Sequence, residues 1–268
     1  MATPSVQNNA ARYGEENVFL FVPNLIGYTR VIFAVASLYY MPLHPRTCSL
    51  LYSFSCLLDA LDGAAARRLG QSTRFGAVLD MITDRCTTTC LLVFLASAFP
   101  RWSIVFQGLI SLDYSSHYVH MYATLAMGGN RQSHKQIDES RPWVLRTYYS
   151  NTKVLFTVCL LNELFFIALY LLSFSSPPPL ANSPNFEAPQ STPSQSWSSP
   201  WSAGAMELAR ANKIDDSFPQ FLLGVSSVFM IFKQYVNVVQ LIEASKWLVR
   251  RGDLETRRNA RLGKKRDQ

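Results

Sequence analysis

Four aspartates at regular spacings are the residues of this sequence best suited to chemistry. Asp59 and Asp62 are three residues apart, and Asp80 and Asp84 are four apart, so each pair lies on one face of a helix. The connection between the two segments is short, which predicts antiparallel neighbouring helices whose four carboxylates converge. Hard oxygen donors of this kind suit Mg²⁺ or Mn²⁺, which usually complete their shells with water and substrate phosphate oxygens.

The apolar surroundings of these acids favour a functional role. An aspartate at the centre of a membrane helix costs roughly 2.5–3.5 kcal/mol on insertion scales, and crowded carboxylates also repel one another. Bound divalent cations relieve both costs. The alternative is a purely structural helix pair whose carboxylates are neutralised by Arg67 and Arg85, but acids at membrane depth indicate function by default.

Small residues surround the aspartates. Gly63, the three alanines that follow it, and Gly76 leave a surface where a phosphate or nucleotide could approach the backbone closely. Arg67 and Arg68 supply fixed positive charge beside that surface.

The elements that must position these residues are transmembrane helices. Of the 268 residues, 49% are hydrophobic and only 16% are charged, whereas a soluble domain carries about 25% charged residues. Several apolar runs approach the roughly 20 residues that cross a bilayer. We therefore expect an all-α integral membrane protein, a six-transmembrane-helix bundle with helices near 23–42, 47–66, 75–98, 102–126, 152–174 and 217–243.

The basic residues predict the orientation of this bundle. Eighteen of them fall on one side of the expected membrane and four on the other. The positive-inside rule then places both termini, the loop 67–74 and the active site on the cytosolic side. The net charge of +7 is explained by this distribution and by contact with an anionic leaflet of membrane lipids. We expect no nucleic-acid partner.

The chain is interpreted as one membrane domain, residues 1–245, followed by a basic cytosolic tail, residues 246–268. The segment 175–215 is rich in Ser and Pro and has little to bury, so we expect a disordered lumenal loop inserted into the domain.

The aspartate stretch resembles the signature of the CDP-alcohol phosphotransferase family, D-x2-D-G-x2-A-R-x8-G-x3-D-x3-D. It matches at every fixed position, which are Asp59, Asp62, Gly63, Ala66, Arg67, Gly76, Asp80 and Asp84. A second match is Asn24 with Arg30 six residues on, similar to N-x2-T-x2-R, although Gly27 stands where the family has Thr.

The resemblance implies two divalent ions, Mg²⁺ or Mn²⁺, that bind the CDP diphosphate. Their implied ligands are Asp59, Asp62, Asp80 and Asp84, and Asp84 is also the implied general base. The residues implied to bind the nucleotide are Asn24, Gly63, Ala66, Arg67, Thr73 and Gly76.

Longer stretches resemble eukaryotic members of this family that use inositol as the acceptor, the phosphatidylinositol synthases. They are Phe21–Tyr28, Thr73–Ala77, Leu79–Cys86 and Ser133–Asp138. This resemblance implies CDP-diacylglycerol and myo-inositol as substrates, phosphatidylinositol and CMP as products, a homodimer, and location in the endoplasmic reticulum membrane or the Golgi.

The acceptor pocket is less well marked. Asp113 and His117 lie four apart on one expected helix face, and they either contact a neutral polyol or form a hydrogen-bonded pair that holds the helix in place. Arg141 and Arg146 either contact phosphate or lipid headgroups or only set topology. On the last helix, the polar face formed by Lys233, Asn237 and Gln240 either meets the site or lets the lysine snorkel to the interface.

Three alternatives stay open at this stage. The first is another acceptor, such as serine, glycerol 3-phosphate, or a diacylglycerol that takes phosphocholine or phosphoethanolamine from its CDP ester. The second is a transporter whose acids and histidines form an ion pathway, which leaves the spacing of the glycines and Arg67 unexplained. The third is a structural membrane scaffold, which only the hydrophobic helices support.

Overall fold

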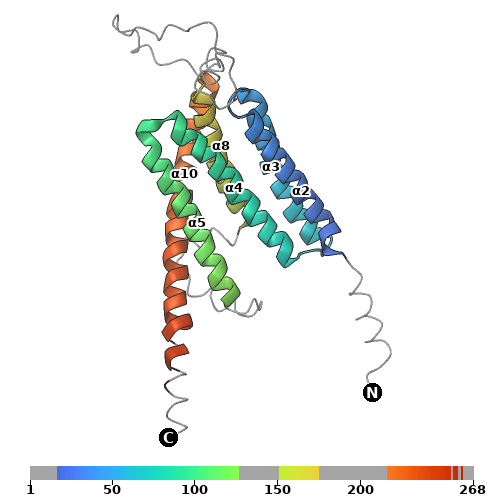
Figure 1. The fold of residues 1–268 in the computed structure, drawn as a ribbon, viewed down its shortest axis with the longest axis vertical. Helices are drawn as coiled ribbons and strands as arrows, with labels where there is room; N and C mark the ends of the chain where they lie inside the picture. The colour runs from blue at the N-terminus through green and yellow to red at the C-terminus, as the bar shows by residue number, and fades with distance from the viewer. Residues whose placement is uncertain (1–16, 127–150, 175–215, 255, 259–260, 262–268) are drawn as a thin grey trace, which may run out of the picture. The chain divides into compact units, whose positions relative to one another are not determined.

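The computed structural model describes residues 17–126, 151–174, 216–254, 256–258 and 261. This part of the chain is helical and contains no strand. Its long helices lie at the six predicted positions (Figure 1), and they are α2 (Val22–Tyr40), α3 (Pro45–Arg68), α4 (Arg74–Ala98), α5 (Ser103–Ala126), α8 (Thr152–Leu172) and α10 (Ser217–Trp247). Short helical turns flank them, namely η1 (Val18–Leu20), η2 (Pro100–Trp102) and the π-helical η4 (Leu248–Leu254).

The turn between α3 and α4 is fixed by its own sequence. Gly70 adopts φ +65° directly after the helix, a conformation that glycine takes without steric cost. The amide of Gln71 donates to the carbonyl of Ala66 at 3.0 Å, the closing bond of a Schellman cap. Thr73 then caps α4, because its Oγ1 accepts from the amide of Gly76 at 3.0 Å. The two aspartate-bearing helices are thus joined by a tightly specified turn.

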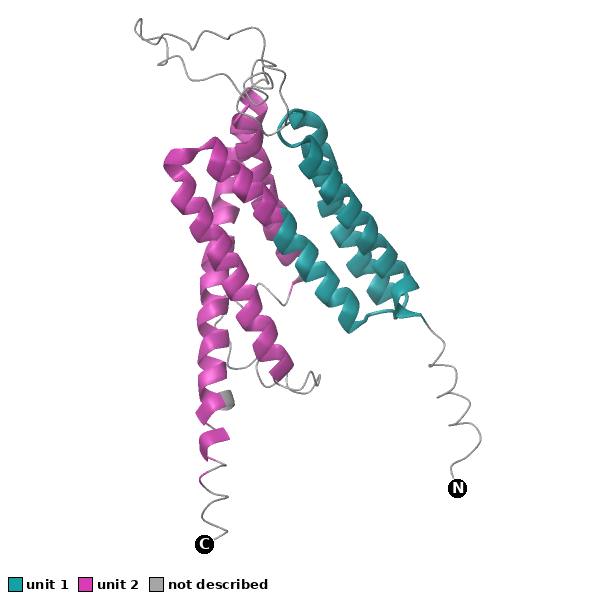
Figure 2. Cartoon of the chain, in the orientation of Figure 1, with its two compact units in different colours: residues 1–87, 197–209 teal, residues 88–196, 210–268 magenta. Residues whose placement is uncertain are grey.

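The chain divides into two compact units, coloured separately in Figure 2. Among the described residues, the first unit runs from residue 17 to Thr87, and the second holds the remainder. The boundary falls within α4. The prediction of a single domain over residues 1–245 remains a prediction.

The first unit contains α2, α3 and the first half of α4. Helix α2 packs along α3 (Figure 1), with Tyr52 and Cys48 of α3 buried. The hydroxyl of Ser55 on α3 donates to the carbonyl of Arg30 on α2 at 3.1 Å. This bond fixes the height of Arg30 relative to the aspartates of α3.

The second unit contains the end of α4 with α5, α8 and α10. Helices α8 and α5 both pack on α10, and Val158 of α8 lies against Val236 of α10. Phe94 of α4 contacts Tyr170 and Phe174, with ring centroids 5.2 and 5.9 Å apart. The interior of this unit also holds many polar side chains, described below.

Two described helices are long and apolar enough to cross a membrane, Lys153–Leu172 and Ser217–Arg250. A third candidate span is the pair Arg74–Ala98 and Pro100–Ala126, which is bent by 120°. Large apolar side chains point outward, and Ile104 is 79% exposed and Phe221 72%. This pattern fits a surface solvated by lipid, so the chain has the features of a multi-pass membrane protein. The count of six spans stays a prediction.

Several sequence predictions lie outside the described residues. They concern the N-terminal segment 1–16, the Ser/Pro-rich segment 175–215, and Arg141 and Arg146. The basic tail is described in part, since α10 passes into η4, which ends at Leu254.

Candidate metal centre and nucleotide pocket

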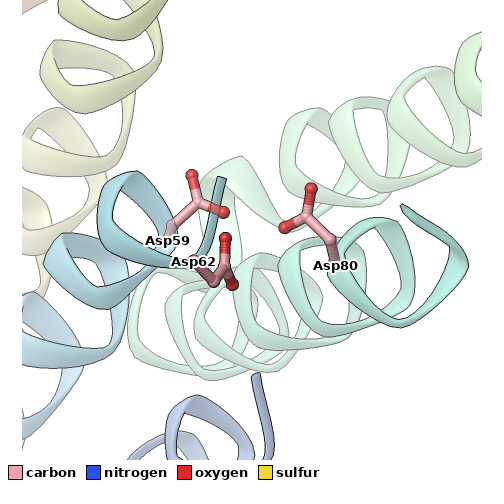
Figure 3. Close-up of side chains that lie close together, drawn as sticks. All are labelled: Asp59, Asp62 and Asp80. Carbon is pink, nitrogen blue, oxygen red and sulfur yellow. The ribbon is translucent and has the colours of Figure 1, made fainter. Parts of the chain in front are cut away.

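The carboxylates of α3 and α4 converge as predicted. Asp59, Asp62 and Asp80 can each offer one oxygen such that all three oxygens lie within 4.8 Å of one another. Figure 3 shows Asp59 and Asp62 on one helix and Asp80 on the other, with their carboxylates facing a common space. Asp84 is not part of this group of three. Three carboxylate oxygens at such short separations are a suitable donor set for a hard divalent cation.

All four aspartates contact one arginine. Arg30 Nη1 lies 2.7 Å from Asp62 Oδ2 and 2.7 Å from Asp80 Oδ1. Arg30 Nη2 lies 2.8 Å from Asp59 Oδ1 and 2.6 Å from Asp84 Oδ1. The contacts with Asp62, Asp80 and Asp84 are charge-assisted hydrogen bonds, the strong class of polar contact, and the contact with Asp59 is an ion pair. Arg30 therefore joins the signature residues of both helices into one cluster.

The charge balance of this cluster tests whether cations fit. Four carboxylates and one guanidinium carry a formal charge of −3, since Arg30 offsets only one of the four negative charges. Asp59, Asp80 and Asp84 are each about a third to a half exposed at the side chain, so ions can reach them, whereas Asp62 is 11% exposed. The residues present therefore fit one or two divalent cations by charge, donor type and access.

Of the two neutralising partners named from the sequence, Arg85 forms an ion pair with one aspartate of the cluster. Its Nη2 lies 3.6 Å from Asp84 Oδ2, longer than any contact of Arg30 with the cluster. The guanidinium of Arg67 lies beside Gly63, where an added Cβ would stand 3.4 Å from its Nη1. Arg30 contacts all four aspartates and is the main neutralising partner. The sequence contains an indication of this role. Arg30, Arg85 and Lys233 are the basic residues that fall inside the predicted helices away from their ends, and a cation at membrane depth demands a partner.

A pocket lies beside the cluster within the first unit. The residues that the sequence assigned to the nucleotide all line it, which brings together Asn24, Gly63, Ala66, Arg67, Thr73 and Gly76. Asp62 and Asp80 form its border with the carboxylate cluster. An anionic group in this pocket would meet both the guanidinium of Arg67 and any cation held by the aspartates.

The side chains around position 76 explain why the signature has glycine at this position. A Cβ at this position would lie 2.8 Å from Asn24 Oδ1 and 3.1 Å from Thr73 Oγ1. Asn24 is buried and is held by a bond from its Nδ2 to the carbonyl of Val18 at 2.6 Å. Gly27, at the position where the family motif has Thr, faces Leu79, whose Cδ2 would stand 3.0 Å from an added Cβ. Both glycines thus permit close approach between α2 and α4.

A second polar cluster lies in the second unit. His117 Nδ1 lies 2.9 Å from the carbonyl oxygen of Asp113 and 3.5 Å from Asp113 Oδ1. Asn237 Nδ2 of α10 donates to the same Asp113 Oδ1 at 3.5 Å and to Gln234 Oε1 at 3.3 Å. The predicted pair on α5 is therefore part of an interhelical network.

Sequence analysis missed the other end of this network. Gln234 Nε2 donates to Asn162 Oδ1 at 3.2 Å, and Asn162 Nδ2 donates to Glu163 Oε1 at 3.2 Å. Thr88 of α4 also donates to Glu163, at 3.3 Å. An acid in the middle of a strongly apolar helix was the available signal.

The predicted polar face of α10 is buried. Lys233 is 6% exposed, and Asn237 and Gln240 are still less exposed. Lys233 therefore does not snorkel along the surface. Asn237 Oδ1 has no hydrogen-bond partner, a costly state for a buried acceptor.

Comparisons with known proteins bear on the signature residues and on the whole chain. A sequence model of the CDP-alcohol phosphatidyltransferase family matches residues 20–175. A protein of Schizosaccharomyces pombe named CDP-diacylglycerol–inositol 3-phosphatidyltransferase is 48% identical over 249 residues, which cover 92% of this chain and 96% of the relative. Proteins of the same name from Rattus norvegicus and Homo sapiens are 56% and 54% identical over 164 residues, covering 61% of this chain and 76% of each relative. No solved structure matches the chain.

Proposed function

The chain belongs to the CDP-alcohol phosphatidyltransferase family, and we propose that it transfers the phosphatidyl group of CDP-diacylglycerol to myo-inositol, which yields phosphatidylinositol and CMP. The observation that carries this proposal is the similarity to the S. pombe relative along nearly the full length of both chains. The complete carboxylate signature, with its four aspartates drawn together around Arg30, supplies the chemistry that such a transfer needs.

We propose that Asp59, Asp62 and Asp80 hold two divalent ions, Mg²⁺ or Mn²⁺, with Asp84 contributing at the edge of the group. When bound, such ions neutralise the diphosphate and stabilise the departing nucleotide phosphate. The pocket lined by Asn24, Thr73 and Gly76 receives the cytidine nucleotide, and Arg67 binds its phosphates.

Asp84 is the proposed general base. An alcohol is a weak nucleophile near neutral pH, so a positioned carboxylate must take its proton during the attack. Asp84 lies outside the closest oxygen triad, and its side chain is 34% exposed. A carboxylate that is held by Arg30 but stands apart from the triad is well suited to proton transfer.

The acceptor is bound, in this proposal, by Asp113 and His117, with Arg141 and Arg146 as further candidates. A neutral polyol calls for several hydrogen-bonding groups more than for charge. The buried amides that extend from Asp113 through Asn237 supply such groups.

We further propose a homodimer in the endoplasmic reticulum membrane, with the Golgi as the alternative location. The described helices α2, α3, α4, α5, α8 and α10 each cross the bilayer once, and both termini and the aspartate cluster face the cytosol. The diacylglycerol tails of the substrate then stay in lipid while its nucleotide reaches the site.

The experiment that tests the function is an acceptor screen. Membranes containing the protein are incubated with CDP-diacylglycerol, Mg²⁺ or Mn²⁺, and one labelled alcohol at a time, and lipid product and CMP are both measured. Inositol should give labelled lipid and CMP in equal amounts. Product with serine or glycerol 3-phosphate but not with inositol would replace the acceptor, and ion flux without CMP would replace the enzyme by a transporter. The Asp84→Asn variant is the matched control for background synthesis, because added metal should not restore its rate.

A further inference from the structure

Arg30 ties the two aspartate helices together in a crossed pattern. Its Nη1 contacts Asp62 of α3 and Asp80 of α4, and its Nη2 contacts Asp59 of α3 and Asp84 of α4. Each terminal nitrogen therefore links one carboxylate from each helix. The guanidinium itself comes from a third helix, α2.

Arg30 contacts a single oxygen of each carboxylate, and the second oxygen of Asp84 lies 3.6 Å from Arg85. Arg30 engages Oδ1 of Asp59, Asp80 and Asp84 and Oδ2 of Asp62, one oxygen from each side chain. A carboxylate has two oxygens and about four acceptor sites. In Asp59, Asp62 and Asp80, one oxygen can therefore stay bound to the guanidinium while the other serves as a metal ligand.

Burial and hydrogen bonding fix the position of Arg30. The residue is 2% exposed, and its backbone carbonyl accepts the hydrogen bond from Ser55. Leaving the cluster would strand a buried guanidinium without its four partners, which is strongly unfavourable. The planar fork of arginine also fixes the angles between its partners, which the single ammonium of lysine cannot do.

We propose that Arg30 is a positioning residue for the metal site, a shared outer partner that holds one oxygen of each signature aspartate so that the remaining oxygens converge on the cations. The inference rests on the proposed function only in taking the aspartates as metal ligands. It goes beyond that function because it assigns Arg30 to metal affinity. The sequence motif had included Arg30 without giving it a role.

The test measures metal binding without substrate. The full chain is purified in detergent, and Mn²⁺ affinity is determined by titration followed by electron paramagnetic resonance. Arg30→Gln removes the charge and the fork, and Arg30→Lys keeps the charge alone. Loss of an outer partner of a metal ligand typically lowers metal affinity 10–100-fold, so both variants should bind Mn²⁺ that much more weakly. The control is Arg46→Lys, at an exposed position at the start of α3.

Three results would overturn the proposal. Tighter Mn²⁺ binding by Arg30→Gln would show that Arg30 competes with the metal for the same oxygens. Unchanged affinity with a lowered unfolding temperature would reduce Arg30 to a structural ion pair. Wild-type affinity in Arg30→Lys would show that charge suffices and that the fork does not position the carboxylates. Where neither variant stays folded, Ser55→Ala keeps the guanidinium and loosens its helix, and it should show a smaller loss in the same direction, whereas wild-type affinity would contradict the proposal.

The acceptor screen on the wild-type protein separates this inference from the function. A protein that makes phosphatidylinositol while its Arg30 variants bind Mn²⁺ normally would refute the positioning role alone. A protein that binds Mn²⁺ through Arg30 but makes no phosphatidylinositol would refute the acceptor assignment alone.

Discussion

A carboxylate that binds a metal and a carboxylate that accepts a proton fail differently when each becomes an amide. The structure draws Asp59, Asp62 and Asp80 into one close triad of oxygens and leaves Asp84 outside it. All four nevertheless share Arg30. Kinetic measurements are therefore needed to separate the metal ligands from the proton acceptor, and the dependence of the rate on metal concentration distinguishes them.

We predict two classes among the four Asp→Asn variants. Changes at Asp59, Asp62 and Asp80 weaken metal binding, so raised Mg²⁺ or Mn²⁺ should restore part of the rate. Asp84→Asn removes the proton acceptor, so the rate should fall by the 10²–10⁴-fold that positioned base catalysis contributes, about 3–5 kcal/mol of barrier. Added metal should not restore it, and CDP-diacylglycerol affinity should survive.

The measurement is transfer rate against metal concentration for all four variants, alongside substrate affinity. Rescue of Asp84→Asn by metal to the same extent as the other three would show that the four carboxylates act together as a metal cage.

A second prediction at the residue scale concerns Gly76. Gly76→Ala places a Cβ 2.8 Å from the buried Asn24 Oδ1, so α4 must shift away from α2 and the pocket must deform. We expect transfer activity to fall at least tenfold, with a raised apparent KM for CDP-diacylglycerol. Gly108→Ala is the matched control, because nothing lies within 4 Å of its added Cβ. Equal activity of the two variants would show that the close approach at Gly76 is dispensable.

At the scale of helices, the polar side chains form two separate groups, a charged cluster and a hydrogen-bond network. Around α2, α3 and α4 they gather charge, and Arg30 balances it only in part. Around α5, α8 and α10 they form a chain of amide and hydroxyl contacts from Thr88 to His117. Hydrogen bonds between membrane helices are individually modest, about 0.6 kcal/mol on average and up to about 1.7.

The network prediction separates helix packing from acceptor binding. Asn237→Leu removes the donor to Asp113 and Gln234, so a purely structural network should lose about 0.6–1.7 kcal/mol of stability with an unchanged KM for inositol. An acceptor pocket should instead show a raised KM for inositol, which is the result that our proposal requires. Thermal unfolding in detergent and the inositol dependence of the rate are the two measurements.

Glu243→Gln is the control for the network. It breaks the pair between Glu243 and Lys246 on the same helix, in which the lysine side chain is 55% exposed, and an exposed pair contributes about 0–1 kcal/mol. An unchanged inositol KM in Asn237→Leu would remove the network from the acceptor site.

For the whole molecule, the decisive property is the side of the membrane that each helix end faces. The bias of eighteen basic residues to four comes from the sequence, and the turn between α3 and α4 carries the aspartate cluster with it. The orientation of that turn therefore decides which compartment supplies inositol and receives CMP.

We predict that Arg74 faces the cytosol and Arg101 the lumen. In a background without native cysteines, Arg74→Cys in sealed microsomes should react with an impermeant thiol reagent, and Arg101→Cys should react only after the membrane is opened. Both residues are exposed at helix ends, so burial does not explain a difference between them. Protection of the cysteine at position 74 would reject the topology.

Local patterns determined the helices of this protein and the pairing of its aspartates on helix faces. Apolar runs placed six long helices at their observed positions within a few residues, and spacings of three and four put each aspartate pair on one helix face. The turn residues Gly70 and Thr73 allow the aspartate-bearing faces of α3 and α4 to lie side by side. These are short-range properties, so a sequence displays them directly.

Tertiary structure alone decided which distant charges meet. Arg30 lies 29 to 54 positions from the four aspartates along the chain, and no periodicity links it to them in preference to Arg67 or Arg85. Only the packing of α2 along α3, at the height set by Ser55, brings its guanidinium to all four carboxylates. The network through Asn162, Glu163 and Gln234 was hidden for the same reason, because a buried polar residue takes its meaning from partners on other helices.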